Sequence, residues 1–88
     1  MINRNEMNLT DIQKKVMPQV IEILKKEPEC VSSIEKTNSG WTMLCDVLER
    51  KAIPETFDLL KVFEFNLDAE AKITGFKLLK KIRRGDIS

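Results

Sequence analysis

Residues 30–50, CVSSIEKTNSGWTMLCDVLER, carry the clearest structural signal in this sequence. Apolar and polar side chains alternate here with a period near two, and β-branched and aromatic residues are frequent, which is typical of β-strands. The polar cluster at 38–40 predicts a tight hairpin turn in which Gly40 takes a positive φ. We therefore expect strands over Cys30–Thr37 and Trp41–Arg50. The second strand would carry Trp41, Met43, Cys45 and Val47 on one face, and Thr42, Asp46 and Arg50 on the other.

Two more strands are predicted after this hairpin. The Ile53-Pro54 pair favours extended backbone before a turn, and a third strand is expected over about Phe57–Leu67. Residues 68–72 turn the chain into a last strand at about Ile73–Arg83. Strict alternation in the last strand would put Thr74, Phe76, Leu78 and Ile82 on one face and Lys77, Lys81 and Arg83 on the other, with Lys80 out of step.

The segment before these strands has a different period. From Leu9 to Leu24, apolar residues recur every three or four positions, which predicts an amphipathic α-helix. Thr10 and Gln13 would form a capping box at its start. Pro18 removes one backbone hydrogen bond, so a kink or a division of the helix is expected there.

These elements predict an α+β fold in which one N-terminal helix packs on a four-stranded antiparallel β-meander. Such a sheet must cover one face, and the helix is the available cover. The chain's 88 residues are enough for one domain, and 42% hydrophobic with 33% charged residues is typical of a globular protein. We expect a flexible tail over residues 1–8 and a single domain over residues 9–88.

The aromatic residues are expected in the core, because so small a domain needs their large area buried. They are Trp41, Phe57, Phe63, Phe65 and Phe76. For Trp41 the alternative is an exposed anchor that binds a partner.

Residue content excludes several kinds of chemistry. The chain has no histidine, which rules out imidazole metal sites and histidine-assisted nucleophiles. It has no phosphate-binding loop, dinucleotide or C-x-x-C motif. The carboxylate pairs Asp46 with Glu49 and Asp58 with Glu64 look like surface charges. We therefore predict no enzyme activity, no cofactor, no metal and no small-molecule substrate.

The cysteines and the hydropathy pattern bear on location. Cys30 and Cys45 are too few for a disulfide framework and are expected to be buried free thiols. No apolar run approaches the ~20 residues of a membrane span, and the first residues lack the apolar core of a signal peptide. These features predict a cytoplasmic protein without a membrane partner.

Charge is distributed unevenly, although the net charge is only +1. Residues 27–70 hold ten acids and four bases, whereas residues 71–88 hold six bases and one acid. Bases at the last strand form a candidate surface for a protein partner or for phosphates, namely Lys77, Lys80, Lys81, Arg83 and Arg84. The alternative is a solvated edge strand whose lysines prevent edge-to-edge pairing.

A series of residues between Val31 and Arg84 resembles the gas vesicle protein O family in order and spacing. After Val31–Glu35, a Gly-Trp pair opens a strand, a strand ends in Glu, and an Ile-Pro turn follows. Then come Asp-x-Leu-x-x-aromatic-Glu, a Leu-Asp pair, and a closing aromatic and basic strand. These positions are Gly40, Trp41, Glu49, Ile53, Pro54, Asp58, Leu60, Phe63, Glu64, Leu67, Asp68, Phe76 and the bases from Lys80 to Arg84. Departures from the family pattern are Ala52, where the family tends to have Arg, and Phe63, Phe76 and Ile82, where it tends to have Tyr.

The resemblance implies an accessory protein that is required for gas vesicle formation, and hence for buoyancy. Such a protein would act through contacts with other gas vesicle accessory or shell proteins, in the cytoplasm and associated with the vesicles. Two alternatives stay open. A helix on an antiparallel meander also resembles cystatin-like inhibitory modules, and the basic last strand could belong to a regulator that binds nucleic acid. No aromatic row interleaves with those bases, so nucleic acid is the weaker alternative.

Overall fold

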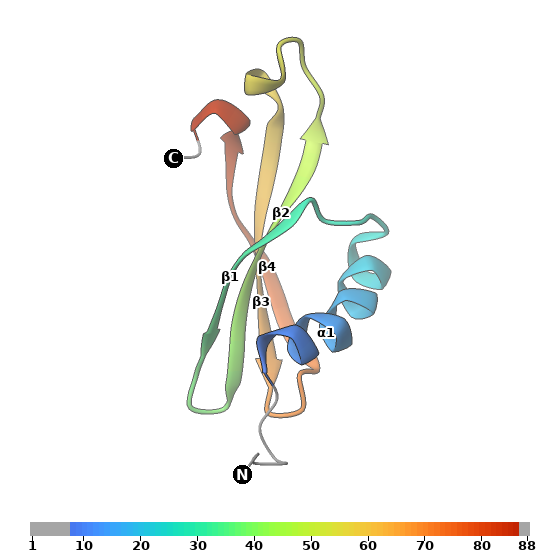
Figure 1. Cartoon of the computed structure of the whole chain (residues 1–88), viewed down its shortest axis with the longest axis vertical. Coiled ribbons are helices and arrows are strands. Elements are labelled where there is room, and N and C mark those ends of the chain that lie inside the picture. The colour runs from blue at the N-terminus through green and yellow to red at the C-terminus, as the bar shows by residue number, and fades with distance from the viewer. Residues whose placement is uncertain (1–7, 87–88) are drawn as a thin grey trace.

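One helix precedes a four-stranded antiparallel sheet in the computed structural model, which describes residues 8–86 (Figure 1). The elements are α1 (Leu9–Leu24), β1 (Cys30–Lys36), β2 (Gly40–Arg50), β3 (Leu59–Asp68) and β4 (Ile73–Arg83), with short 3₁₀ helices η1 (Glu55–Phe57) and η2 (Arg84–Asp86). The strands lie in the order β1-β2-β3-β4, so each pairs with its neighbour in the chain. The predicted α+β meander is confirmed. Apart from Asn8, the tail predicted over residues 1–8 lies outside the described residues.

The helix begins two residues earlier than a cap at Thr10 would place it. Asn8 is the N-cap, and its Oδ1 accepts a hydrogen bond from the backbone N–H of Asp11 at 2.8 Å. The predicted Thr10 capping box is therefore wrong. Asn is among the most favoured N-cap residues, and Asp11 in the first turn also suits the positive end of the helix dipole.

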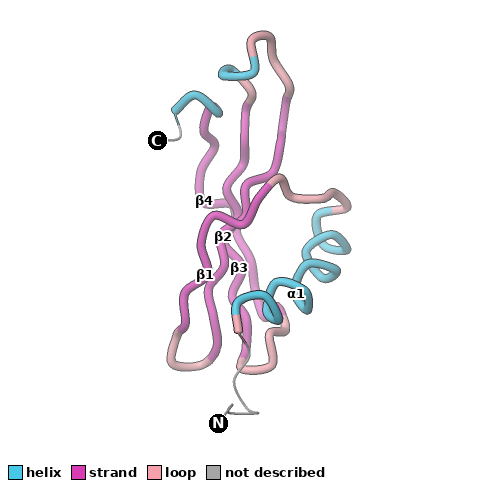
Figure 2. Tube along the Cα trace, viewed as in Figure 1, coloured by secondary structure: helices cyan, strands magenta, loops and turns pink. Residues whose placement is uncertain are grey.

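Pro18 does not divide the helix, which is continuous over Leu9–Leu24. The proline lies on the exposed side, so the Lys14 carbonyl that loses its usual partner can be hydrated. Figure 2 shows α1 bending as it passes into its second half. Of the two predicted outcomes, a kink or a division, the division does not occur, because an exposed proline leaves no buried carbonyl without a partner.

The core forms between the apolar face of α1 and one face of the sheet. The helix contributes Ile12, Val16 and Val20, and the sheet side contributes Trp41, Met43, Cys45, Phe65, Leu67 and Ala71. Trp41 is therefore a core residue, as predicted. Each large side chain buried this way contributes roughly 1.5 to 3 kcal/mol to folding.

Polar contacts also join α1 and the residues that follow it to the sheet. The Gln19 amide donates from Nε2 to the Ala71 carbonyl and accepts at Oε1 from the Ile73 N–H, each at 3.0 Å. Just after the C-terminal end of the helix, Lys26 Nζ donates to the Leu48 carbonyl. Because these bonds join α1 to the β3–β4 turn and to β2, the helix is held at one place on the sheet.

The helix covers only part of a long, strongly twisted sheet. The molecule measures 49 × 25 × 20 Å, and β2, β3 and β4 continue past the helix toward the upper end in Figure 1. With seven residues, β1 is shorter than its neighbours and does not accompany them there. The result is a helix-covered half and an uncovered, three-stranded half that ends at the 51–58 connection.

Gly40 is required for a different reason from the one predicted. No described glycine has a positive φ. Instead, a Cβ at position 40 would lie 1.9 Å from the carbonyl oxygen of Leu67 on β3. The close approach of two backbones, and not turn conformation, excludes a side chain here.

A β-bulge at Leu79 corrects the predicted faces of β4. Leu78 pairs with Phe63 and Lys80 pairs with Val62, so two β4 steps match one β3 step. The extra residue reverses the alternation beyond Leu79. By register, Phe76, Leu78, Lys81 and Arg83 share the face of the helix, while Lys77, Lys80 and Ile82 share the other face. The predicted grouping of Lys77 with Lys81 and Arg83 is wrong for this reason.

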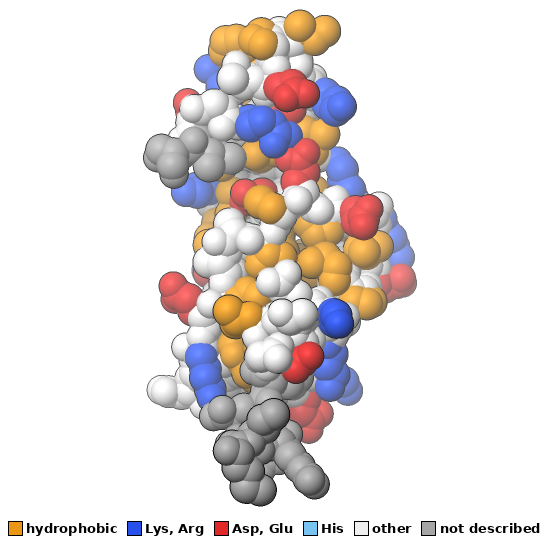
Figure 3. Space-filling view, viewed as in Figure 1, with side chains coloured by type: hydrophobic (Ala, Val, Ile, Leu, Met, Phe, Trp, Pro, Cys, Tyr) orange, Lys and Arg blue, Asp and Glu red, His pale blue; other side chains and the backbone are white. Residues whose placement is uncertain are grey.

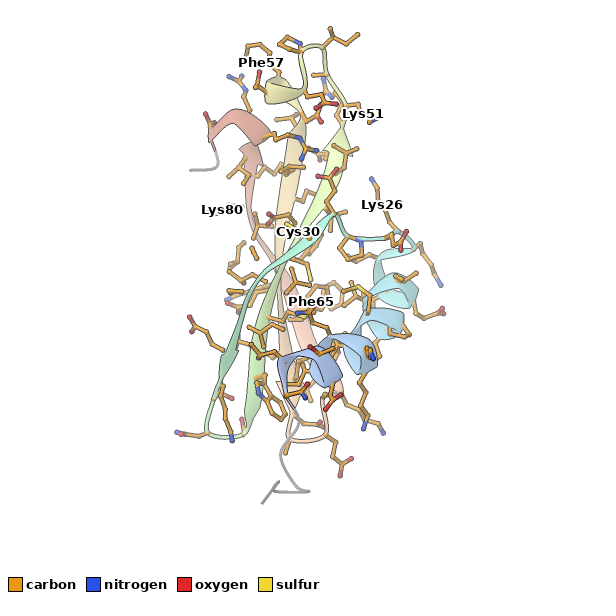
Figure 4. The ribbon with its side chains drawn as sticks, viewed as in Figure 1. Lys26, Cys30, Lys51, Phe57, Phe65 and Lys80 are labelled. Carbon is orange, nitrogen blue, oxygen red and sulfur yellow. The ribbon has the colours of Figure 1, made fainter. Side chains whose placement is uncertain are left out.

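Two of the aromatic residues expected in the core lie at the surface. Phe57 is 52% exposed because the chain forms η1 there and β3 begins only at Leu59. Phe76 is also exposed, since it lies on the edge strand beyond the cover of α1. Phe65 is fully buried, as predicted, whereas Phe63 is only half-buried and packs against the core. Figure 4 shows Phe65 near the helix and Phe57 at the far end.

Candidate partner-binding surface

The five bases predicted to bind a partner do not form one stripe. Four of them, Lys77, Lys80, Lys81 and Arg83, lie on β4, which is an edge strand, and Arg84 begins η2. Because of the bulge, Lys77 and Lys80 point to the face away from α1, and Lys81 and Arg83 to the face of α1. Any partner that touches all four must therefore reach both faces of this edge.

On the face away from the helix, Lys77 and Lys80 differ in their partners. Lys77 Nζ lies 3.7 Å from Glu64 Oε1, which is on the neighbouring strand. Lys80 is exposed, and no acid within residues 8–86 pairs with it. An exposed pair such as Lys77–Glu64 contributes little to stability, so both ammonium groups remain open to a partner.

On the face of the helix, Lys81 and Arg83 have intramolecular contacts. Lys81 Nζ is 3.0 Å from Glu49 Oε1, which also lies 3.4 Å from Lys61 Nζ. The hydrogen bond from Lys81, with a second from Lys61, lowers the pKa of the Glu49 carboxyl. The Arg83 guanidinium lies 5.8 Å from the centre of the Phe57 ring. This distance is that of a cation–π contact, which holds Arg83 against the far end of the molecule.

Arg84 is engaged within the chain. Its Nη2 binds both carboxylate oxygens of Glu29, at 2.9 and 2.7 Å, and its Nε donates to Asp58 Oδ2 at 3.1 Å. Its backbone N–H donates to the Asp58 carbonyl at 2.8 Å. We conclude that Arg84 ties η2 to the segments before β1 and β3, a structural role.

Two carboxylates expected at the surface are buried. Asp58 is 2% exposed and accepts hydrogen bonds from the Ala52 N–H, at 2.7 Å, and from Arg84. The Ala52 N–H, followed by Arg84, holds the pKa of the Asp58 carboxyl below its ordinary value of 3.8. Asp46 is 7% exposed and accepts from Cys30 Sγ at 3.2 Å. The surface prediction for both is wrong, because non-local strand pairing and Arg84 enclose them.

The cysteines are free, and they lie on opposite faces of the sheet. Cys30 pairs in register with Asp46 and is exposed, so its predicted burial is wrong, whereas Cys45 is buried as predicted. Burial raises the pKa of the Cys45 thiol to about 12. Partial burial and then the hydrogen bond to Asp46 raise the pKa of Cys30. Both thiols are therefore poor nucleophiles at neutral pH.

Exposed apolar residues lie beside the bases on β4, and sequence reasoning did not find them. Phe76, Leu78 and Leu79 are 48%, 44% and 42% exposed. The Phe76 ring stacks on Phe65, with 5.7 Å between ring centres, so the exposed group continues the core outward. The one available signal was the Leu78-Leu79 pair, because consecutive apolar residues cannot both face one core from a regular strand.

The far end of the molecule is a second apolar feature. Ile53, joined to Pro54 by a cis peptide bond, is exposed in the connection between β2 and β3. In Figure 3, hydrophobic side chains lie at the upper end of the space-filling view. An open hollow of about 400 Å³ nearby is lined by Lys51, Ala52, Ile53, Glu55 and Asp58. This hollow is too open to enclose a ligand.

The acidic positions of the family-like series have identifiable structural contacts. Glu49 and Glu64 pair with lysines of β4, and Asp58 binds Arg84. Asp68 Oδ1 accepts from the N–H groups of Glu70 and Lys72, at 2.9 and 3.0 Å, which closes the β3–β4 turn. The apolar positions Trp41, Leu60 and Leu67 are buried. Most residues of this series therefore stabilise the sheet, and few of them are available to bind a partner.

Within residues 8–86, no three His, Cys, Asp or Glu side chains come together as metal ligands. The described residues contain no helix that is long and apolar enough to cross a membrane.

Comparison with known proteins identifies a matching family. The sequence model described as gas vesicle synthesis protein GvpO matches residues 2–88. The gas vesicle protein O of Haloferax mediterranei is 37% identical over 82 residues, which are 92% of this chain and 59% of the relative. The gas vesicle protein O1 of Halobacterium salinarum is 31% identical over 83 residues, covering 94% of this chain and 70% of the relative. A gas vesicle protein O from a Streptomyces species is 39% identical over 67 residues, covering 76% and 52%.

The resemblance noted from the sequence is confirmed by these matches. No solved structure matches the chain. The chain spans only about half to two thirds of the relatives' lengths, at 59%, 70% and 52%.

Proposed function

The chain belongs to the gas vesicle synthesis protein GvpO family, and on this premise we propose that it is a non-enzymatic accessory protein of gas vesicle formation. It acts through contacts with other gas vesicle proteins, either accessory or shell proteins. It works in the cytoplasm, associated with the vesicles. The family match over residues 2–88 is the observation that carries this proposal.

The surface of β4 supports action by protein contact. Bases and exposed apolar side chains occur together on this edge strand, and such mixed patches are typical of binding surfaces. The buried titratable groups are explained by the fold, because Asp46 and Asp58 are hydrogen-bonded and Cys45 packs in the core. We propose Lys77, Lys80, Lys81 and Arg83 as contact residues, with Arg84 holding the end of the strand in place.

The placement of the bases does not favour nucleic acid. Phosphate binding needs a row of cations that follows one backbone, together with aromatic platforms for single strands. Here the bases divide between two faces, and Lys77 and Lys81 each lie within ion-pair distance of a glutamate. No observation favours an inhibitory module.

A complementation experiment tests the proposal. The gene for this chain is deleted from a gas vesicle gene cluster and restored, and vesicles are assayed by flotation and electron microscopy. We expect loss of buoyant vesicles on deletion and recovery on restoration. Vesicles that form equally well without the gene would refute the proposed function.

A double variant tests the proposed surface in the same cells. Lys77→Glu with Lys80→Glu reverses two charges on one face of β4, whereas Lys36→Glu reverses one charge at the opposite edge of the sheet. All three positions are exposed, so we expect each purified variant to keep its thermal midpoint within about 3 °C. Only the double variant should fail to restore vesicles. Full rescue by it would exclude this face of β4 as the contact surface.

A further inference from the structure

We propose that β4 is a docking edge that pairs with an extended segment of a partner protein, in which acidic and apolar residues alternate. The partner segment would add a fifth strand to the sheet. This inference deepens the proposed function, because it states the chemistry and the geometry of the contact. It depends on that function in one respect only, namely that the partner is a gas vesicle protein.

The backbone of β4 is open on one side. Its eleven residues pair with β3, and no other described strand lies beyond it. In an antiparallel strand, alternate residues direct their N–H and C=O groups away from the existing neighbour. These groups can bind a further strand, which is the general hazard and use of a sheet edge.

The apolar residues of β4 need a cover that the helix does not provide. Phe76 and Leu78 lie on the face of α1, yet both are more than two-fifths exposed. Of the residues on β4, the helix-covered core includes only Ile73 at its margin. A strand laid beside β4 would place its own apolar side chains next to Phe76 and Leu78, since cross-strand neighbours on one face lie about 5 Å apart.

Charge determines what the other face of that strand must carry. Lys77 and Lys80 lie on the face away from the helix, and β4 contains four bases and no acid. Figure 4 shows Lys80 on the opposite side of the view from Lys26, so it is remote from the end of α1. A segment with Asp or Glu facing these lysines and apolar residues facing Phe76 and Leu78 matches both faces at once.

A second copy of this chain is a poor occupant of the same edge. Pairing of β4 with β4 would bring four bases of one molecule against four bases of the other. Like charges placed directly opposite in a sheet are destabilising. Edge lysines are also a known protection against self-pairing, which is consistent with a strand kept open for a different partner.

The other edge of the sheet lacks these features. The strand β1 has seven residues, none of them a large exposed hydrophobic side chain, and it carries one acid and one base. Ser32 Oγ already donates to the Leu44 carbonyl on β2. The edge at β1 therefore serves as the internal control for any measurement at β4.

Synthetic peptides test the proposal on the full chain. The probe is a ten-residue peptide with alternating Glu and Val, compared with a Lys/Val peptide and with a Glu/Val peptide N-methylated at every second residue. We expect the Glu/Val peptide to bind at least tenfold more tightly than either comparison peptide. N-methylation removes backbone donors while the charge is kept, so it separates strand pairing from charge attraction.

Hydrogen exchange and one matched pair of variants locate the site. Amides of β4, and not those of β1, should gain protection when the Glu/Val peptide binds. Lys80→Glu should weaken binding about five- to tenfold, because an attractive cross-strand pair becomes repulsive. Lys36→Glu should change it less than twofold.

Three outcomes would overturn the proposal. They are equal binding of the N-methylated peptide, protection gained at β1 instead of β4, and a free chain that sediments as a β4-paired dimer. These readouts are independent of the cellular test. Vesicles that form equally well without the gene, together with intact peptide pairing, would count against the proposed function alone. Loss and recovery of vesicles without any peptide pairing would count against the docking edge alone.

Discussion

Replacing Gly40 with alanine tests whether this glycine is needed for space or for backbone conformation. A Cβ at position 40 would lie 1.9 Å from the Leu67 carbonyl oxygen, whereas ordinary contact begins at 3.4 Å. The backbones of β2 and β3 would have to separate locally by about 3.4 − 1.9 = 1.5 Å. Since Gly40 pairs with Asp68 at the end of the ladder, the movement would break hydrogen bonds that close this end of the sheet.

The expected loss of stability is large for a domain of this size. Overpacking costs about 1 to 3 kcal/mol, and two lost backbone hydrogen bonds add about 1 kcal/mol each. The sum, about 3 to 5 kcal/mol, compares with a total unfolding free energy of roughly 4 to 13 kcal/mol for a chain of this length. Gly40→Ala should therefore lower the urea midpoint by about 2 to 3 M, or prevent folding at 37 °C.

Two comparison variants separate the explanations. Gly40→Asn would be tolerated if the position required a positive φ, because Asn adopts that region readily. We expect it to be at least as destabilising as alanine. Gly75→Ala, also in the sheet, places its Cβ at least 4 Å from any neighbour and should change the unfolding free energy by less than about 1 kcal/mol. A Gly40→Ala protein as stable as the unmodified chain in urea unfolding, or an Asn variant that rescues it, would refute the close-approach argument.

Three further predictions concern the core, acid stability and the thiols. Phe65→Ala should cost about 3 to 5 kcal/mol in urea unfolding, because the side chain is fully buried, whereas Phe57→Ala should cost less than about 1 kcal/mol; equal losses would contradict the assigned burial. The pKa of Asp58 is lower in the folded protein than its ordinary 3.8, so its stabilisation is complete above that pH and is lost as pH falls below it. Asp58→Asn should flatten the decline of the urea midpoint between about pH 5 and pH 2, and an unchanged slope would count against this assignment. In the native protein iodoacetamide should label Cys30 slowly and leave Cys45 unlabelled, and both cysteines should react once the chain is unfolded in urea; mass spectrometry showing native labelling of Cys45 first would contradict the structure.

Regular periodicity predicted the main elements well. The helical pattern of apolar residues runs from Leu9 to Leu24, where the helix lies, and the last strand, expected at about Ile73–Arg83, has those bounds in the structure. In each of these segments the apolar residues recur at a regular spacing over many residues, so the local side-chain pattern is sufficient to recognise the element. The N-cap was misplaced by two residues, because Asn8 and Thr10 are both good N-caps and the pattern does not choose between them.

The candidate surface was predicted only in part. The bases of β4 were identified from charge alone. Phe76 was expected in the core, and simple alternation placed Leu78 on the same face as Phe76, but it did not show that both side chains are exposed. The sequence did register the bulge as Lys80 out of step, without showing where the extra residue lies. The buried state of Asp58 left no local signal, since Ala52 and Arg84 reach it from other segments.

Local pattern was enough to place one helix before four strands and to connect the chain with its family, because both depend on residue order and spacing along the chain. Tertiary structure alone decided which aromatic side chains are covered, why Gly40 has no room for a side chain, and which face each lysine of β4 occupies. Those outcomes depend on the length of α1 relative to the sheet and on the pairing of β3 with β2 and β4. Both are set by contacts between residues far apart in the sequence.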